Sequence, residues 1–237
     1  MATIESVDGI REWFDETYRA RGRRYLRPPQ AYRVLLDLLK VRPGGKLLDV
    51  ACGPGHLLSE ARGSGLELFG VDFSSVALDM GRRLAPEARF FEADAAELPF
   101  SDASFDYITC IGALERMPER ERVLAEQLRV ARPDARFCFL VRGADTFTWR
   151  LVMERLGYRN TRGHQDAASL RAWTERFEHA GFHIEAVLPD QWPLMWAERL
   201  LHRVGVETSF TRMRSGFVPL RFANEFIFVM TRGSSSL

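Results

Sequence analysis

Features that define several large classes of protein are scarce or missing in this sequence. Cysteine occurs three times, at Cys52, Cys110 and Cys138, and the odd number without a CxxC spacing argues against a disulfide framework or a zinc site. No apolar run approaches the roughly 20 residues that span a bilayer, and the first ten residues lack the apolar core of a signal peptide. We therefore expect a cytoplasmic protein without a metal centre and without stable membrane insertion.

Charge of one sign is also scarce. The 33 basic and 32 acidic side chains leave a formal net charge of +1, so nothing attracts the chain as a whole to nucleic acid or to an anionic membrane. The one strong basic cluster spans residues 18–29, YRARGRRYLRPP. It is typical of a solvated helix face or of a lid over a ligand, with a single-strand nucleic-acid patch as the alternative. Within it, Tyr25 and Arg27 are candidates to contact an acidic ligand.

Short apolar runs alternate with amphipathic stretches between residues 46 and 141. The runs KLLDV, ELFGVD, ARFFEA, FDYITCI and ARFCFLV are typical of strands that are buried on both faces. Most stretches between them repeat apolar residues at helical spacing. This alternation predicts an α/β fold in which helices cover both faces of a parallel sheet.

The helix patterns also make local predictions. The stretch 74–84 opens with a serine cap and carries one apolar side, made of Val76, Met80 and Leu84. The stretch 117–130 has Pro118 in its first turn. Further helices are predicted over 5–20, 30–40, 145–157, 168–180 and 193–205, and strands within 179–188 and 221–230. The domain prediction is an N-terminal helical lid at 1–40 and a core at 41–237, with an insertion at about 189–221.

Two glycines follow the first predicted strand, in LLDVACGPGHLL. Ligands of open parallel sheets bind beyond the carboxyl ends of the strands. Gly53 and Gly55 allow the backbone to approach a ligand there, and the next helix directs its amide dipole to the same place. Asp72, at the end of the second strand, follows Asp49 at the roughly 20-residue interval at which an acid accepts the hydroxyls of a ribose. Polar residues also follow the third and fourth strands, in EADAAELPF and GALER.

These motifs resemble those of the class I S-adenosylmethionine-dependent methyltransferases, in particular the bacterial small-molecule, type 11-like branch. The resemblance covers about residues 30–190 and is carried mainly by LLDVACGPG and GVDFS. The chain departs from the dinucleotide-binding fingerprint GxGxxG. Its first two glycines correspond to Gly53 and Gly55, and the third glycine of the pattern is missing. The resemblance implies a Rossmann-like, doubly wound, mostly parallel sheet of about seven strands with helices on both faces.

The resemblance also implies roles for individual residues. Asp49 and the Ala51–Gly55 backbone would hold the methionine amino end of S-adenosylmethionine. Asp72 would accept the ribose hydroxyls, since a carboxylate is a strong acceptor for them, and Phe73 would lie against the adenine.

The next two strand ends would complete the cofactor site. By the same resemblance, Asp94 would accept from the adenine amino group near the Ala95 amide, and Cys110 and Ile111 would line the floor beside the reactive methyl. The full candidate set for cofactor binding is Asp49, Ala51, Gly53, Gly55, Asp72, Phe73, Asp94, Ala95, Cys110 and Ile111.

Glu115 and His164 are the candidate catalytic residues. Family members often have LEH where this chain has Leu114-Glu115-Arg116, so a histidine is absent at that place. His164 lies in the polar loop RGHQDAASL. A general base is needed only if the methyl acceptor must lose a proton.

The predicted function is transfer of a methyl group from S-adenosylmethionine, leaving S-adenosylhomocysteine, to the oxygen, nitrogen or carbon of a small-molecule acceptor. A non-catalytic S-adenosylmethionine-binding or scaffolding protein and a nicotinamide-dependent oxidoreductase are the alternatives. No metal and no nucleic-acid partner are expected, and the sequence leaves the acceptor and the oligomeric state open. Residues 143–167 and 189–221, with their aromatic side chains, are expected to form the acceptor pocket.

Overall fold

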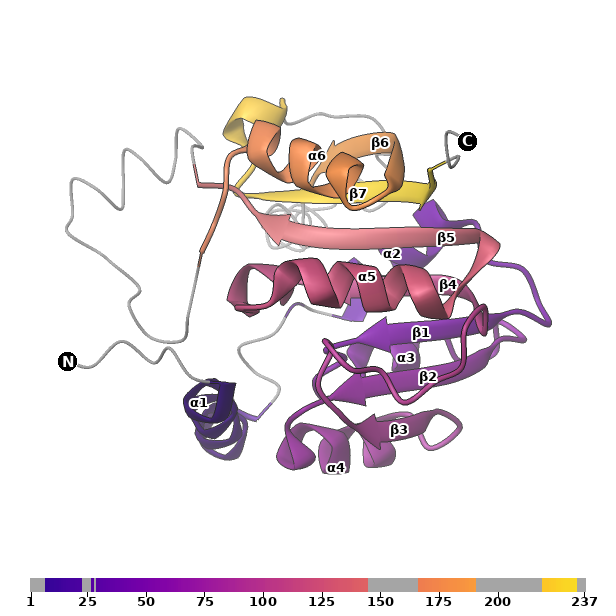
Figure 1. The fold of residues 1–237 in the computed structure, drawn as a ribbon. Coiled ribbons are helices and arrows are strands. Elements are labelled where there is room, and N and C mark those ends of the chain that lie inside the picture. Colours follow the sequence, from indigo (N-terminus) through magenta and orange to yellow (C-terminus); the bar gives the residue numbers. More distant parts are fainter. Residues whose placement is uncertain (1–6, 23–26, 28, 145–165, 191–218, 234–237) are drawn as a thin grey trace, which may run out of the picture.

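The described part of the chain forms one mixed sheet of seven strands in the order β3-β2-β1-β4-β5-β7-β6 (Figure 1). The computed structural model describes residues 7–22, 27, 29–144, 166–190 and 219–233. Neighbouring strands from β3 to β5 are parallel, whereas β7 runs antiparallel to both β5 and β6. The strands are β1 (Lys46–Val50), β2 (Glu67–Asp72), β3 (Arg89–Glu92), β4 (Phe105–Ile111), β5 (Ala131–Arg142), β6 (Phe182–Pro189) and β7 (Glu225–Arg232). The predicted Rossmann-like, mostly parallel sheet is thus confirmed.

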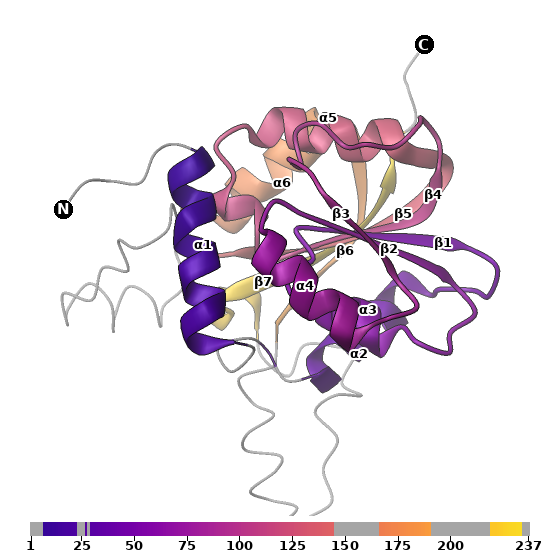
Figure 2. The same ribbon diagram turned by 90° about the horizontal axis from the view of Figure 1, so that it is seen from below.

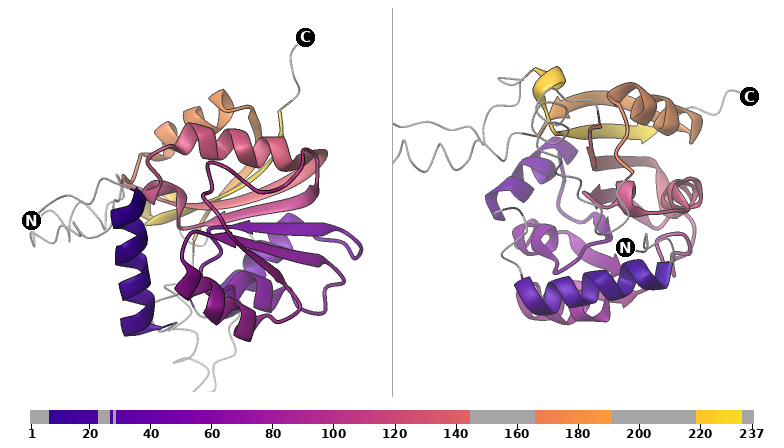
Figure 3. Two further views of the ribbon diagram at one scale, coloured as in Figure 1. Left: turned by 60° about the horizontal axis from the view of Figure 1, so that its bottom comes forward. Right: turned by 90° about the vertical axis from the view of Figure 1, so that its left-hand side faces the viewer.

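Helices cover both faces of this sheet, as predicted. They are α1 (Val7–Arg21), α2 (Pro29–Leu39), α3 (His56–Glu60), α4 (Ser75–Leu84), α5 (Arg120–Val130) and α6 (Leu170–His179), with the short 3-10 helices η1 (Leu114–Arg116) and η5 (Leu220–Phe222). Figure 2 shows α2, α3 and α4 on one face and α5 and α6 on the other. The remaining helix, α1, lies across the carboxyl ends of the parallel strands (Figure 3).

Two hydrophobic clusters fill the space between the sheet and its helices. Alternate residues of β5 enter different clusters: Phe137 and Phe139 pack with α5 and α6, whereas Cys138 and Leu140 pack with α2 and α3. This division follows from the strand geometry, in which successive side chains point to opposite faces. Strands buried on both faces explain why the sequence shows continuous apolar runs.

The buried side of α4 differs from the expected one. Its buried residues are Ala77, Leu78 and Gly81, whereas the expected apolar side, Val76, Met80 and Leu84, is only half-buried. The cause is a close approach between helix and sheet. A Cβ at Gly81 would lie 2.7 Å from the ring of Phe90 in β3, so the helix needs glycine at this point of contact.

Helix α5 begins later than the sequence pattern indicates. Its first residue is Arg120, with Glu119 at the N-cap, so Pro118 precedes the helix instead of occupying its first turn. Met117 is extended, with φ −91° and ψ 124°. A residue before proline is biased away from the helical region, which keeps the chain extended to this point.

The expected lid at 1–40 contains two helices with different surroundings. In α2, Leu35, Leu36 and Leu39 are buried in the hydrophobic cluster beneath α3, so α2 is a core helix. Of these two helices, α1 is the one that lies over the strand ends. The predicted helices at 145–157 and 193–205 lie outside the described residues, as does most of the insertion at 189–221. No described helix has the length and the apolar character to cross a membrane.

Candidate functional site

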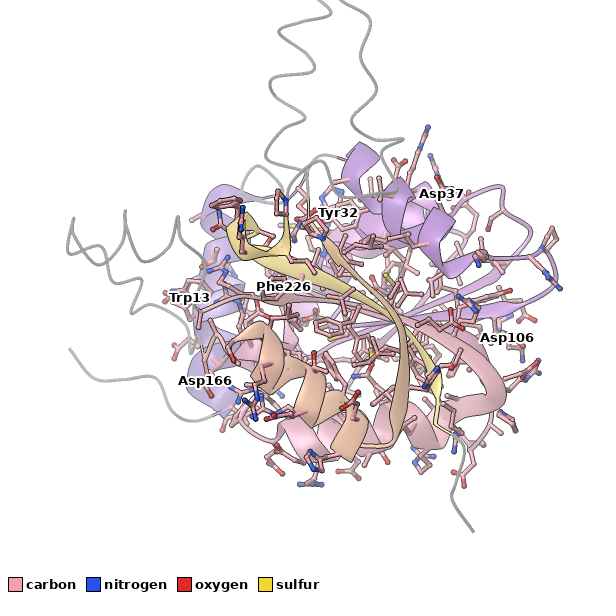
Figure 4. The ribbon with its side chains drawn as sticks, turned by 90° about the horizontal axis from the view of Figure 1, so that it is seen from above. Trp13, Tyr32, Asp37, Asp106, Asp166 and Phe226 are labelled. Atoms are coloured by element: carbon pink, nitrogen blue, oxygen red, sulfur yellow. The ribbon has the colours of Figure 1, made fainter. Side chains whose placement is uncertain are left out.

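A cavity of about 520 Å³ lies at the carboxyl ends of the parallel strands. Its walls come from α1, from the loops after β1 to β4, from the end of β5 and from the residues around the start of β7. In Figure 4, Trp13 of α1 lies at this end of the sheet and Asp106 at the opposite end. The volume is within the range of sites for small organic ligands.

Asp49 forms a buried part of the cavity wall at the end of β1. It is 3% exposed, and its Oδ1 accepts a hydrogen bond of 2.6 Å from the hydroxyl of Thr109 on β4. Burial raises the pKa of Asp49 to about 7, with a smaller contribution from the nearby charge of Asp72. The chain then turns through Ala51 and Gly53, whose φ angles are 55° and 52°, and both residues line the cavity.

Asp72, the last residue of β2, connects the loop after β1 to the start of α4. Its Oδ2 accepts from the Gly53 amide at 2.8 Å, and its Oδ1 accepts from the Ser74 amide at 2.9 Å. It is 5% exposed, and burial raises its pKa to about 6 although these amide bonds favour the charged form. Ser74 in turn caps α4 by accepting from the Ala77 amide and donates to Asp15 of α1. The predicted serine cap thus also connects α4 to α1.

The loops after β2 and β3 supply the next part of the wall. Phe73 lines the cavity, and its ring centroid lies 5.9 Å from that of Phe14 in α1. Asp94 and Ala95 also line the cavity. One carboxylate oxygen of Asp94 accepts from the Ala96 amide at 2.8 Å, which fixes the direction of this loop.

Two residues of the candidate set do not line the cavity. Gly55 is the N-cap of α3, and a Cβ there would lie 3.0 Å from the ring of Phe90, so this glycine permits close packing of the helix. Cys110 is fully buried in the cluster beneath α5, whereas the following residue, Ile111, lines the cavity. The alternation of side chains along β4 separates these two neighbours.

Glu115 lies in η1, directly after β4, and lines the cavity. It is 1% exposed, and no described residue forms a hydrogen bond to its Oε2. Burial raises its pKa, a shift that its own backbone amide and Arg116 partly offset. The other catalytic candidate, His164, lies outside the described residues.

An ion-pair network that no sequence pattern indicated borders the cavity near Glu115. The side chain of Arg27 pairs with Asp190 at 3.2 Å and with Glu225. Glu225 also pairs with Arg142 at 3.4 Å. Arg27 and Glu225 are 198 residues apart in the sequence, so only the fold brings them together. Arg27 was expected to meet an acidic ligand, and acids of the chain itself occupy its guanidinium.

Two properties of the site concern its chemistry. Among the described residues, no group of histidine, cysteine, aspartate and glutamate side chains has the arrangement of a metal site. The three cysteines are free thiols and are buried. For Cys52, the one that lines the cavity, burial and the nearby acids Asp72 and Asp49 raise the pKa, which disfavours the reactive thiolate.

Comparison with known proteins identifies the same part of the chain. Residues 48–139 match the family model of the methyltransferase domain. The demethylmenaquinone methyltransferase of Renibacterium salmoninarum is 39% identical over 101 residues, a match that covers 43% of this chain and 43% of that protein. The chain thus spans less than half the length of this relative.

Solved structures extend the similarity to the whole sheet. A putative methyltransferase of Haloferax volcanii, in complex with the Trm112 methyltransferase activator, has a TM-score of 0.69 at 19% identity and covers 94% of this chain and 97% of its own. The 1,6-didemethyltoxoflavin-N1-methyltransferase of Burkholderia thailandensis has a TM-score of 0.68 at 16% identity, over 98% of this chain and 92% of its own. At such identities the likeness concerns the fold alone. Residues 48–139 thus resemble a methyltransferase domain in sequence, and the sheet shares its fold with solved methyltransferase structures.

Proposed function

We propose that the protein binds S-adenosylmethionine in this cavity and transfers its methyl group to a small-molecule acceptor. The observation that carries the proposal is a pair of buried carboxyl groups, Asp49 and Asp72, in the cavity wall. No described cationic side chain forms an ion pair with either. Buried acids without a cation are costly, so a ligand that brings hydrogen-bond donors and positive charge is expected there.

The chemistry of this wall fits S-adenosylmethionine. We assign Asp72 to the ribose hydroxyls, because two backbone amides hold its carboxylate at the cavity. We assign Asp49, with the backbone of Ala51 and Gly53, to the amino end of the methionine part. Bound S-adenosylmethionine would supply an electrophilic methyl group, and the neutral thioether of S-adenosylhomocysteine would be the leaving group.

Other lining residues take the remaining contacts in this proposal. Phe73 lies against the adenine, Asp94 and Ala95 meet its amino edge, and Ile111 borders the reactive methyl. Gly55 and Cys110 are left out because they do not line the cavity. The chain's own contribution is then alignment of two bound molecules, for which effective molarities are large.

We restrict the proposed lid to α1. Its Ile10, Phe14 and Tyr18 line the cavity, and the oxygen of Tyr18 would lie 2.8 Å from a Cβ on Gly53. The acceptor named for the relative from R. salmoninarum, demethylmenaquinone, is not assigned to this chain, because that match covers only 43% of it. The free, buried cysteines suit the reducing cytoplasm, where we place the reaction.

Calorimetric titration with S-adenosylhomocysteine and, separately, with NADH tests this proposal. We expect S-adenosylhomocysteine to bind and NADH not to bind. Asp72→Ala should weaken the affinity by about 1.5–3 kcal/mol, the range for hydrogen bonds to a charged group. Asp79→Ala is the matched control, because this aspartate is exposed on α4 and pairs only with Arg82 among the described residues.

The outcomes separate the alternatives. Preference for NADH would favour an oxidoreductase. Binding of S-adenosylhomocysteine without methyl transfer from S-adenosylmethionine to any of a broad panel of small molecules would favour a non-catalytic protein. Equal binding by wild type and Asp72→Ala, with unchanged melting temperatures, would refute the ribose role of Asp72.

A further inference from the structure

The order of the strands divides the cavity into two sides. Asp72 ends β2 and Asp94 follows β3, on one side of β1. Glu115 follows β4, Arg142 ends β5 and Glu225 begins β7, on the other side. All of them line the cavity. If the cofactor occupies the first side, as proposed above, the methyl acceptor must bind on the second. We call this second side, which carries Glu115, Arg142 and Glu225, the acceptor side.

The arginines on the acceptor side already have partners. Arg27 is held by Asp190 and Glu225, and Arg142 is paired with Glu225. An anionic acceptor that bound to either arginine would have to separate ion pairs that are largely shielded from water, at a considerable cost. The acceptor side therefore offers poor recognition for a carboxylate or a phosphate.

Arg116, the third arginine in the wall, is also engaged. Its guanidinium carbon lies 5.7 Å from the ring centroid of Trp13 and 5.4 Å from that of Phe14, both in α1. Such contacts with aromatic faces stabilise a cation in place. The guanidinium thus serves the contact between η1 and α1.

Glu115 is the contrasting group on this side. It is buried and lines the cavity, and its Oε2 has no hydrogen-bond partner among the described residues. A buried acceptor atom without a donor is costly, and the cost is removed when a ligand supplies the donor. Met117 and Val123, which also line the cavity, provide an apolar surface beside it.

We propose that Glu115 selects the methyl acceptor by accepting a hydrogen bond from its hydroxyl or amino group, so that the acceptor is a largely apolar, neutral or cationic molecule with such a donor. This inference rests on the proposed function, because the acceptor side is defined relative to the cofactor. Glu115 is assigned here to binding and orientation. A methyl acceptor without a hydroxyl or amino group would leave the Glu115 carboxylate without this hydrogen bond.

Matched probes test the proposal without knowledge of the natural acceptor. Protein saturated with S-adenosylhomocysteine is titrated, by ligand-observed NMR, with 2-naphthol, 2-methoxynaphthalene and 2-naphthoate, and with 4-ethylphenol, 4-ethylanisole and 4-ethylbenzoate. Within each series, we expect the hydroxyl compound to bind about two- to tenfold more tightly than the ether, the effect of one hydrogen bond. The carboxylate should bind most weakly.

Variants assign the preference to Glu115. Glu115→Leu has a similar size but no acceptor, and the hydroxyl and ether should then bind equally. Glu115→Gln retains an acceptor oxygen and should restore the preference. Glu121→Gln is the control, because this carboxylate lies on α5, is 77% exposed and pairs with Arg176.

The two proposals can fail separately. Titration with S-adenosylhomocysteine reports on the cofactor site and should give equal affinities for the wild type and all three variants. Given that binding, a hydroxyl preference that survives in Glu115→Leu, a preference for the carboxylates, or no uptake of either hydroxyl compound would each overturn the role of Glu115. Absence of S-adenosylhomocysteine binding in the wild type would instead refute the proposed function.

Discussion

At the scale of single residues, the site contains two buried acids, Asp49 and Asp72, that lower the stability of the fold. Asp49 lies beside Asp72 in the cavity wall, and burial raises the pKa of both. Such a carboxyl group is less easily ionised in the folded chain than in the unfolded chain. It therefore lowers the stability of the fold at pH values at which the group is ionised in the unfolded chain. Such acids are expected where a ligand, rather than the fold, needs the negative charge.

Asp49 therefore makes stability depend on pH with a definite sign. Its pKa rises from 3.8 to about 7 on folding, so between these values the folded state binds more protons than the unfolded state. Stability then falls as the pH rises through this window. Since each pH unit corresponds to about 1.4 kcal/mol, the total approaches about 4 kcal/mol.

Asp49→Asn tests this relation. Asparagine keeps the oxygen that accepts from Thr109, so the variant should unfold with a higher free energy than the wild type at about pH 8 and with a similar one at about pH 4. Urea unfolding at the two pH values measures the difference. Binding of S-adenosylhomocysteine should weaken in the same variant. A variant that is no more stable at the higher pH would show that Asp49 does not carry this cost.

At the scale of helices and strands, α4 packs closely on β3 and begins shortly after Asp72, the last residue of β2. We expect Gly81→Ala to destabilise the protein by about 1–3 kcal/mol, because the new Cβ would lie 2.7 Å from the ring of Phe90. Alanine normally stabilises a helix relative to glycine by up to about 1 kcal/mol. Urea unfolding measures the change.

A double-mutant cycle identifies the cause of this loss. In a Phe90→Leu background the added methyl group has more room, so Gly81→Ala should cost less than in the wild type. The same cost in both backgrounds would mean that the ring of Phe90 is not the obstacle.

The contact between η1 and α1 is the second feature at this scale. Arg116 lies over Trp13 and Phe14, so Arg116→Ala should reduce the protection of α1 amides against hydrogen exchange by roughly two- to thirtyfold, for a contact worth about 0.5–2 kcal/mol. Arg176→Ala removes a similar contact with Trp173 of α6 and should leave α1 unchanged. Equal protection of α1 in the wild type and in Arg116→Ala would contradict the inference that Arg116 holds α1 in place.

At the scale of the whole molecule, the network around Glu225 connects the segment before α2 to the end of β6 and the start of β7. Arg27→Met should lower the free energy of unfolding by about 3–5 kcal/mol, because Glu225 and Asp190 would lose their shared cation in a shielded place. Arg122→Met is the control and should change stability little, since its ion pair with Glu119 is exposed. Urea unfolding of both variants checks this, and equal effects would show that the Arg27 network is not structural.

Much of this architecture could be predicted because it depends on local patterns. The runs KLLDV, ELFGVD and FDYITCI have the same bounds as β1, β2 and β4, since a strand buried on both faces leaves an uninterrupted apolar signal. Asp49 and Asp72 could be named because strand ends share one edge of a parallel sheet.

The rest depends on contacts that no local pattern contains. The packing of Gly55 and Gly81 against Phe90 became evident only when α3, α4 and β3 were brought together. The pairing of Arg27 with Glu225 joins opposite ends of the chain. Cys110 and Ile111 are both predicted at the cavity floor, but only Ile111 lines the cavity, because neighbouring side chains of β4 face opposite sides of the sheet.

The most direct test of the central claim is calorimetric titration of the purified protein with S-adenosylhomocysteine, in the wild type, Asp72→Ala and the control Asp79→Ala. We predict binding by the wild type and by the control, and an affinity lower by about 1.5–3 kcal/mol in Asp72→Ala. Absence of binding by the wild type, or equal affinities for all three proteins, would contradict it.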